Sequence, residues 1–135
     1  SASGATTLPY DNTIPQNTEG DQYMSLAVTP NASANKLKID VLCNALGGDD
    51  DLTVALFQDS TANALAAIYG GTAGDINPHP VTLTYFMTAG TTSATTFKVR
   101  AGANTAGTTY FNSVAGAGKY GGVYTSSITI TEIKV

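Results

Sequence analysis

Apolar and polar residues alternate along most of this chain. The clearest stretch is 36–43, where polar residues separate the apolar ones at every second position: Leu37, Ile39, Val41 and Cys43. Successive side chains of a β-strand point to opposite faces, so this pattern predicts a strand with one buried face. We expect further strands at 22–28, 52–58, 64–69, 81–87 and 95–101, another at the end of the stretch 88–111, and one in the β-branched run 127–135. The stretch 62–67 also suits a short helix by propensity, but its length favours a strand.

The pentapeptide Thr-Ala-Gly-Thr-Thr occurs twice, at 88–92 and 105–109, on either side of the strand expected at 95–101. Glycine adopts positive φ without steric cost, so both copies predict turns. About eight short strands at close spacing, without an amphipathic helix, are typical of an antiparallel sandwich or barrel. We therefore predict an all-β fold, an antiparallel β-sandwich of the jelly-roll type. An immunoglobulin-like sandwich is the alternative, although the chain has no Trp and no cysteine pair.

Length and composition indicate one domain. The chain has 135 residues and no break in composition, and a single domain is the usual organisation at this length. Residues 1–7 are small and polar, which predicts a flexible linker, and residues 8–135 form the expected sandwich domain. A linker at this position favours a terminal module cut from a longer protein.

The charge of the chain excludes several partners. Only 12% of the residues are charged, the formal net charge is −4 and the sequence pI is about 4.5. Nucleic-acid binding needs clustered Lys and Arg, whereas the basic residues here are scattered. No apolar run approaches the ~20 residues of a membrane span. We expect neither a nucleic-acid partner nor membrane insertion.

Metal and cofactor sites are not indicated. Cys43 is the single cysteine and His79 the single histidine, so they form neither a disulfide nor a zinc site. The acidic run 49–51 could bind calcium, but it lacks the spacing of an EF-hand loop and is better explained as a solvated turn. We expect no cofactor, no metal, and a role for Cys43 as a small buried apolar residue.

The sequence predicts no catalytic residues. A hydrolase triad needs a nucleophile, a base and an orienting acid, whereas His79 lies between two prolines in an expected loop. A glycosidase needs two carboxylates in a cleft. The candidates, which include Asp11, Asp59, Asp75 and Glu132, fall mostly in turns, where carboxylates usually cap backbone amides.

Once the core face of each strand is assigned, some large aromatic residues are left on the outside. They are Tyr23, Phe57, Phe86 and one of the pair Tyr110 and Phe111. Several outward aromatics on strands with so few charges indicate a covered surface, and contact with identical subunits would cover it. We therefore predict an oligomer interface at Tyr23, Phe57 and Phe86. A sheet buried on both faces within one chain is the alternative.

Sugar binding needs an aromatic platform for the apolar face of the ring and polar side chains for its hydroxyls. Four suitable residues surround the glycine-rich stretch 112–122: Tyr110, Asn112, Tyr120 and Tyr124. Another expected loop, 70–80, carries Asp75, Asn77 and His79. We predict a glycan site among these residues, with tyrosines that serve only packing as the alternative.

Four stretches resemble a module at the C-termini of phage and prophage tail fibre and tailspike proteins. They are 9–20 (PYDNTIPQNTEG), 56–60 (LFQDS), 87–92 (MTAGTT) and 127–133 (SITITEI). The resemblance implies a β-sandwich at the distal end of a trimeric virion fibre, which serves trimerisation, host-surface binding or both. None of these motifs is catalytic, so the resemblance implies no active site.

Two functional hypotheses follow, and a third is weaker. The first is a non-catalytic terminal module of a phage tail fibre or tailspike in the virion, which forms a homotrimer and binds bacterial surface polysaccharide. The second is a monomeric carbohydrate-binding module attached to a polysaccharide-degrading enzyme. The third, a small glycan-degrading enzyme with a carboxylate pair, would require loss of a demonstrated activity in Asp75→Asn.

Overall fold

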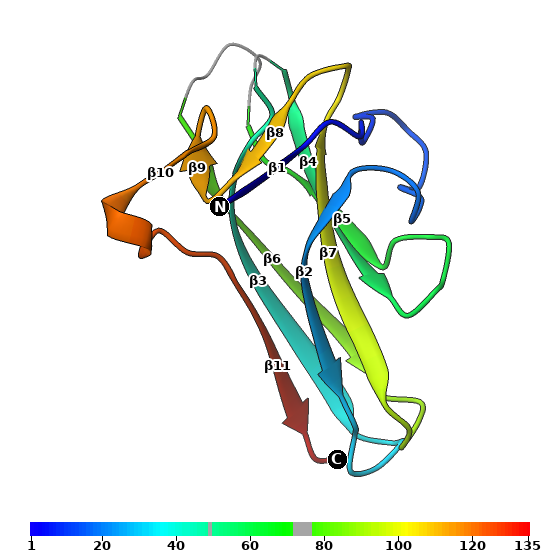
Figure 1. The fold of residues 1–135 in the computed structure, drawn as a ribbon. Coiled ribbons are helices and arrows are strands. Elements are labelled where there is room, and N and C mark those ends of the chain that lie inside the picture. The colour runs from blue at the N-terminus through cyan, green and yellow to red at the C-terminus, as the bar shows by residue number, and fades with distance from the viewer. Residues whose placement is uncertain (49, 72–76) are drawn as a thin grey trace.

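Two antiparallel sheets pack face to face in the computed structural model, which describes residues 1–48, 50–71 and 77–135 (Figure 1). The five-stranded sheet contains β1 (Ala2–Gly4), β8 (Thr109–Phe111), β3 (Lys36–Leu46), β11 (Ser127–Ile133) and β6 (His79–Thr88). The four-stranded sheet contains β2 (Asp21–Val28), β7 (Thr95–Ala103), β4 (Leu52–Gln58) and β5 (Ala66–Tyr69). The prediction of an all-β antiparallel sandwich is confirmed.

The described ranges contain eleven strands rather than about eight, because β1, β9 (Ser113–Val114) and β10 (Ala117–Gly118) are additional and only two or three residues long. The last two form a small hairpin inside the stretch that we expected to be loop. A short 3₁₀ turn, η1 (Tyr120–Gly122), follows it.

Strand β3 organises the five-stranded sheet. On one side it pairs with β6 along almost its whole length. On the other side it pairs first with β11, through residues 36–42, and then with β8, through residues 45–46. This central position explains the strict alternation of its sequence, because one face of the strand lies against the second sheet and the other faces solvent.

The core lies between the two sheets. Its fully buried side chains come from the apolar positions of β3, β4 and β7, and they include Leu37, Ile39, Cys43, Val54, Leu56, Phe97 and Val99. The alternation predicted the same faces. Burying an aliphatic or aromatic side chain of this kind stabilises the fold by about 1.5–3 kcal/mol, so this layer holds the sheets together. In the described residues, no helix is long and apolar enough to cross a membrane.

The N-terminal residues are more structured than we expected. Residues 2–4, which belong to the predicted flexible linker, form β1 and pair with β8, with Ser3 opposite Tyr110. The backbone N–H and the hydroxyl of Thr6 both donate to the carboxylate of Asp21, at 3.0 and 2.9 Å. Leu8 is fully buried. The prediction of a linker is therefore wrong for this part of residues 1–7, because backbone pairing with a distant strand leaves no periodic pattern in a short, small-residue segment.

The predicted exposure of Phe57 is also wrong. Its side chain does point away from the main core, but it is only 1% exposed and packs with Leu8 and Ala55 in a second, smaller core. The N-terminal segment covers this face of β4. Phe57 therefore stabilises the single chain, and the alternative of a sheet buried on both faces holds at this position.

Tyr23 is the second corrected position. A register shift between Gln22 and Met24 marks a β-bulge, and a bulge changes which side chains point inward. The Tyr23 ring stacks on Phe111, with centroids 4.9 Å apart and an interplanar angle of 11°, and its hydroxyl donates to the carbonyl of Thr109 at 3.4 Å. Tyr23 thus packs against the core instead of facing outward. Phe86, at 59% exposure, does face outward as predicted.

Candidate functional site

Two adjoining cavities lie beside the β9–β10 hairpin, one against the loops after β3 and β7 and the other against the segment before β6. The hairpin lies at the end of the sandwich away from the C-terminus (Figure 1). Val114, on β9, lines both of them. This end collects most of the residues that the sequence suggested for glycan binding. The two cavities differ in volume and in the residues that line them.

A pair of tyrosines forms the wall of the smaller cavity. The rings of Tyr120 and Tyr124 meet edge to face, with centroids 5.7 Å apart and an interplanar angle of 83°. Tyr120 is 78% exposed. The cavity has a volume of about 340 Å³, and Asn77 and Lys119 also line it. Burial, and the neighbouring Tyr120, raise the pKa of Tyr124, so its hydroxyl remains a neutral donor and acceptor at physiological pH.

The backbone holds this pair in a tight turn. Tyr120 has a φ of 51°, and Gly121 and Gly122 follow with φ of 62° and 95°. Consecutive residues in this left-handed region reverse the chain sharply, and glycine adopts it without a steric penalty. A tyrosine there is costly, and its ring is 78% exposed rather than buried. The turn therefore places Tyr120 at the rim of the cavity rather than in the core.

Asn112 fixes the position of the loop that carries the tyrosine pair. It has a φ of 51°, its N–H donates to the carbonyl of Asn44 at 2.9 Å, and its Oδ1 accepts from the Ser126 hydroxyl at 2.7 Å. The same hydroxyl accepts from the N–H of Asn44 at 2.8 Å, and Asn44 Nδ2 donates to the carbonyl of Thr125 at 2.6 Å. This network ties the segment before the hairpin to the segment after the tyrosines. Asn112 is therefore placed to position the loop.

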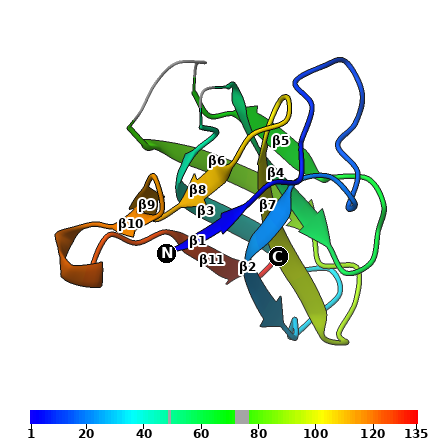
Figure 2. The same ribbon diagram turned by 45° about the horizontal axis from the view of Figure 1, so that its top comes forward.

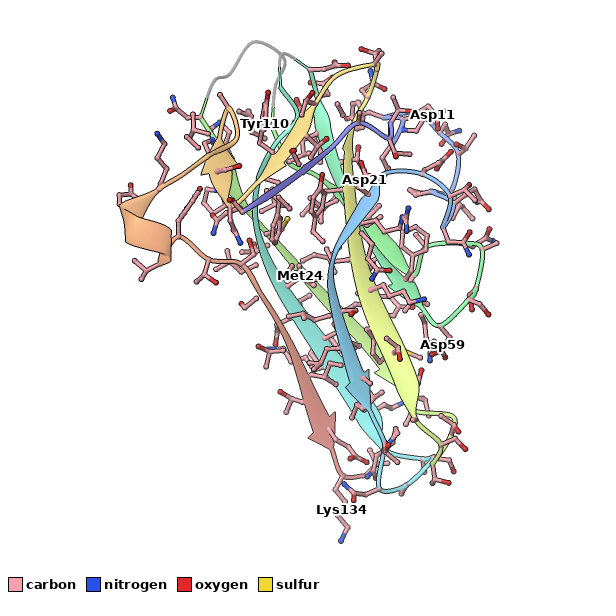
Figure 3. The ribbon with its side chains drawn as sticks, in the orientation of Figure 1. Asp11, Asp21, Met24, Asp59, Tyr110 and Lys134 are labelled. Atoms are coloured by element: carbon pink, nitrogen blue, oxygen red, sulfur yellow. The ribbon has the colours of Figure 1, made fainter. Side chains whose placement is uncertain are left out.

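The larger cavity has a volume of about 690 Å³ and lies on the other side of Val114. Tyr110, which is labelled on β8 in Figure 3, is one of the residues that line it. Asp50 also lines it and accepts hydrogen bonds from the hydroxyl and N–H of Thr105 and from the N–H of Asp51. The bond from the Thr105 side chain is the main cause that lowers the pKa of Asp50. The carboxylate thus stays ionised and ties the β3–β4 loop to the β7–β8 loop.

The predicted glycan-binding residues are only partly brought together. Tyr120 and Tyr124 share one cavity, whereas Tyr110 lines the other. Asp75 lies outside the described residues. His79 opens β6, is exposed and pairs with Ala45 across the sheet.

Two further residues line the smaller cavity, and only the first of them was among the candidates from the sequence. Asn77 joins the tyrosine pair from the loop before β6, although the sequence could place it only in a separate loop. Lys119 was missed, and its position directly before Tyr120 was the available signal.

The described carboxylates that we considered for acid–base chemistry make hydrogen bonds that fix turns. Glu132 accepts from the side chain of Asn35 at 2.6 Å and from that of Asn31 at 2.7 Å. Asp59 accepts from the Thr95 hydroxyl at 2.8 Å and from the N–H of Thr96 at 2.7 Å. Within the described ranges, no three His, Cys, Asp or Glu side chains gather closely enough to hold a metal ion.

Comparison with known proteins places the chain in a family. No curated protein sequence matches it. A solved structure described as "EclA C-terminal domain; sugar-binding protein" is similar in fold, with a TM-score of 0.51 and 16% sequence identity over 96% of this chain and 76% of that one. The family described as the Pgp3 C-terminal domain matches residues 6–135. The chain therefore belongs to the Pgp3 C-terminal domain family.

Proposed function

We propose that this chain is a non-catalytic carbohydrate-binding module, with its binding site at the cavity of Tyr120 and Tyr124. The observation that carries the proposal is the edge-to-face pair of an exposed ring, Tyr120, and a half-buried ring, Tyr124, beside Asn77 and Lys119 in a cavity of about 340 Å³. An aromatic face packs against the apolar C–H groups of a pyranose, while amide and ammonium groups bond its hydroxyls. A cavity of this size suits one or two sugar rings.

Each residue of the cavity has a separate task in this proposal. Tyr120, the more exposed ring, stacks on a sugar, and Tyr124 holds Tyr120 at a right angle and offers its own hydroxyl. Asn77 supplies a donor and an acceptor to neighbouring hydroxyls. Lys119 adds a positive charge, which favours acidic sugars of the kind found in bacterial surface polysaccharides. The description of the solved EclA domain as a sugar-binding protein agrees with this proposal.

The lack of a catalytic role is part of the proposal. The described carboxylates bond backbone N–H groups, threonine hydroxyls and asparagine amides, as turn-capping residues do. A glycosidase acid with a raised pKa would need an apolar setting. Instead, hydrogen bonds lower the pKa of Asp11, Asp50 and Glu132.

We place the module at the tip of a trimeric fibre of the kind found in phage tail fibres and tailspikes, with bacterial surface polysaccharide as its ligand and the virion as its location. The support comes from the outer face of the five-stranded sheet. Phe86 and Ile133 are exposed there, Lys38 and Asp40 pair with each other at 2.9 Å, and the remaining positions are mostly threonines: Thr82, Thr84, Thr88, Thr129 and Thr131. A flat face with an exposed aromatic and few free charges suits contact with identical subunits.

The experiment is a binding screen against immobilised bacterial surface polysaccharides, with the oligomeric state measured by light scattering on the same sample. The proposal predicts binding that Tyr120→Ala weakens and Tyr120→Phe retains, because stacking needs the ring and not its hydroxyl. It also predicts a trimer. Glycan binding by a monomer would favour a carbohydrate-binding module beside a polysaccharide-degrading enzyme. Binding that Tyr120→Ala leaves unchanged would contradict the site.

A further inference from the structure

The N-terminal segment crosses the outer face of the four-stranded sheet and is pinned to it at several points (Figure 2). The N–H of Leu8 donates to the carbonyl of Ala103 at 2.9 Å, and the N–H of Tyr10 donates to Oδ1 of Asn104 at 2.8 Å. Further along, Arg100 donates to the carbonyls of Glu19 and Gly20 at 2.7 and 2.6 Å. Because β7 and the loop that follows it hold both ends of this segment, the segment is fixed in place over the outer face of the sheet.

A cavity of about 150 Å³ lies between this segment and strands β4 and β5. It is on a different face of the sandwich from the tyrosine pair at Tyr120. Each water molecule occupies roughly 30 Å³ of the liquid, so the cavity holds a group about the size of one sugar ring and not an extended chain. Its walls carry two aromatic rings, a carboxylate and a buried hydroxyl, which come from parts of the sequence that are distant from one another.

The aromatic rings are those of Tyr10 and Tyr69. Their centroids are 4.9 Å apart, the planes are tilted by 44°, and Tyr10 is 58% exposed. The hydroxyl of Tyr69 donates to Oδ1 of Asp51 at 2.8 Å, and this bond raises the pKa of Tyr69. The bond also fixes the orientation of the Tyr69 ring. Two tilted rings, one of them held in place, form an angled apolar surface against which the C–H face of a pyranose packs.

Asp11 supplies the polar group beside these rings (Figure 3). Its Oδ1 accepts from the N–H of Thr13 at 2.7 Å and from the hydroxyl of Thr13 at 2.6 Å. These bonds lower the pKa of Asp11 and hold the carboxylate in one orientation. Both use Oδ1, which leaves Oδ2 to accept from a ligand hydroxyl. A preorganised carboxylate next to an aromatic surface is the arrangement that a neutral polyhydroxylated ligand requires.

Thr53 adds a feature that the fold alone does not explain. It lines the cavity, and its buried Oγ1 has no hydrogen-bond partner among the residues that the structure describes. Buried hydroxyls are nearly always paired in folded proteins. After a rotation of the Thr53 side chain, an oxygen atom of a ligand in the cavity would form the hydrogen bond that Oγ1 lacks.

From these contacts we infer a second binding site, formed by Tyr10, Asp11, Thr53 and Tyr69, for a single neutral pyranose ring. The ring packs on the two tyrosines, and two of its hydroxyls bond Asp11 and Thr53. The inference extends the proposed carbohydrate binding from one site to two. The two sites differ in character, because the first carries a lysine and the second a carboxylate, so the second disfavours acidic sugars.

The test is a ¹H–¹⁵N chemical-shift titration of the full chain with D-glucose, D-galactose, D-mannose and L-fucose as separate probes. We expect at least one of them to shift the amides of Tyr10, Asp11, Thr53 and Tyr69 saturably. Asp11→Asn keeps the acceptor for Thr13 but loses the carboxylate, so it should weaken binding about tenfold or more. Tyr69→Ala should weaken it similarly, whereas Tyr120→Ala, at the other site, should leave it unchanged.

The outcomes for the two sites can be told apart. Shifts confined to Asn77, Lys119 and the Tyr120–Tyr124 pair would overturn the second site and leave the proposed function standing. Shifts at Tyr10 and Tyr69 that vanish in Asp11→Asn would establish the second site even if the first bound nothing. Absence of shifts at Tyr10, Asp11 and Tyr69 with all four sugars would overturn it. Thr53→Val, which keeps the shape of the side chain, tests the buried hydroxyl without removing the carboxylate.

Discussion

The carboxylate of Glu132 accepts a 2.6 Å hydrogen bond from the side-chain amide of Asn35, which lies 97 positions earlier in the chain. The same carboxylate accepts from the N–H of Asn31 at 2.8 Å and from its side-chain amide at 2.7 Å. One residue on the last strand therefore closes the loop between β2 and β3. Through this contact the C-terminal strand is tied to the loop that connects the two sheets, at the end of the sandwich opposite the tyrosine pair.

This arrangement predicts a pH-dependent loss of stability. The hydrogen bond from the side chain of Asn35 is the main cause that lowers the pKa of Glu132 below its ordinary value of 4.5, and the hydrogen bonds from Asn31 lower it further. Because the folded pKa is depressed, the stabilisation is fully present above the unfolded pKa and is lost as pH falls through the folded one. Glu132→Ala should lower the thermal midpoint at pH 7, and the difference from wild type should shrink below pH 4.5. Thermal unfolding across this pH range measures it, and a pH-independent difference would contradict the assignment.

The small core on the outer face of β4 predicts a large effect of Leu8→Ala. Leu8 is fully buried against Phe57 and Ala55, so its truncation should leave a cavity and cost about 2–5 kcal/mol. Leu26→Ala is the matched control, because Leu26 is 38% exposed at the edge strand and should cost less than about 2 kcal/mol. Urea unfolding gives both values. Equal costs would mean that the N-terminal segment does not cover the sheet in solution.

Cys43 should be unreactive in the folded protein. Burial raises the pKa of its thiol to about 12, and the thiolate is the reactive form. A thiol reagent such as 5,5′-dithiobis(2-nitrobenzoic acid) at pH 8 should therefore react only after denaturant is added, with the rate limited by unfolding. Rapid reaction of the native protein would show that the centre of β3 is accessible.

Phe86 tests the proposed subunit contact. It is the most exposed aromatic side chain on the outer face of the five-stranded sheet, among the described residues. Phe86→Glu should shift the chain from trimer to monomer in light scattering without changing its circular dichroism. Tyr120→Glu, at a more exposed position at the loop end, should leave the oligomer intact. A trimer that survives Phe86→Glu would place the contact elsewhere.

The parts of the fold that depend on local alternation could be predicted from the sequence. Leu37, Ile39 and Cys43 alternate strictly with polar residues, and they lie in the core as the pattern indicates. The position of Phe57 could not be predicted in this way, because what covers it is Leu8, a residue from a segment without any periodicity. Tyr23 was misassigned because a bulge reverses the facing of side chains and leaves no signature in composition.

The candidate site shows the same division between local and distant information. Tyr120 and Tyr124 are close in sequence, so their proximity could be expected, and they do pair. Their contact with the cavity that Asn77 lines depends on how two loops meet at the end of the sandwich. Tyr110 is nearer in sequence to Tyr120 than Asn77 is, yet Asn77 lines the cavity of the tyrosine pair and Tyr110 lines the other one. The distance between residues in the sequence does not indicate which of the two cavities each residue lines.

The most direct measurement is a calorimetric titration of the chain, of Tyr124→Ala and of Tyr10→Ala with a polysaccharide that the wild type binds. Tyr124 supports the ring of Tyr120, so its loss should weaken binding at least about tenfold, as expected for a residue that anchors an apolar contact. Tyr10→Ala, on another face, should retain that affinity for the longer glycan. If Tyr124→Ala bound as tightly as the wild type, the glycan would not be held by the tyrosine pair.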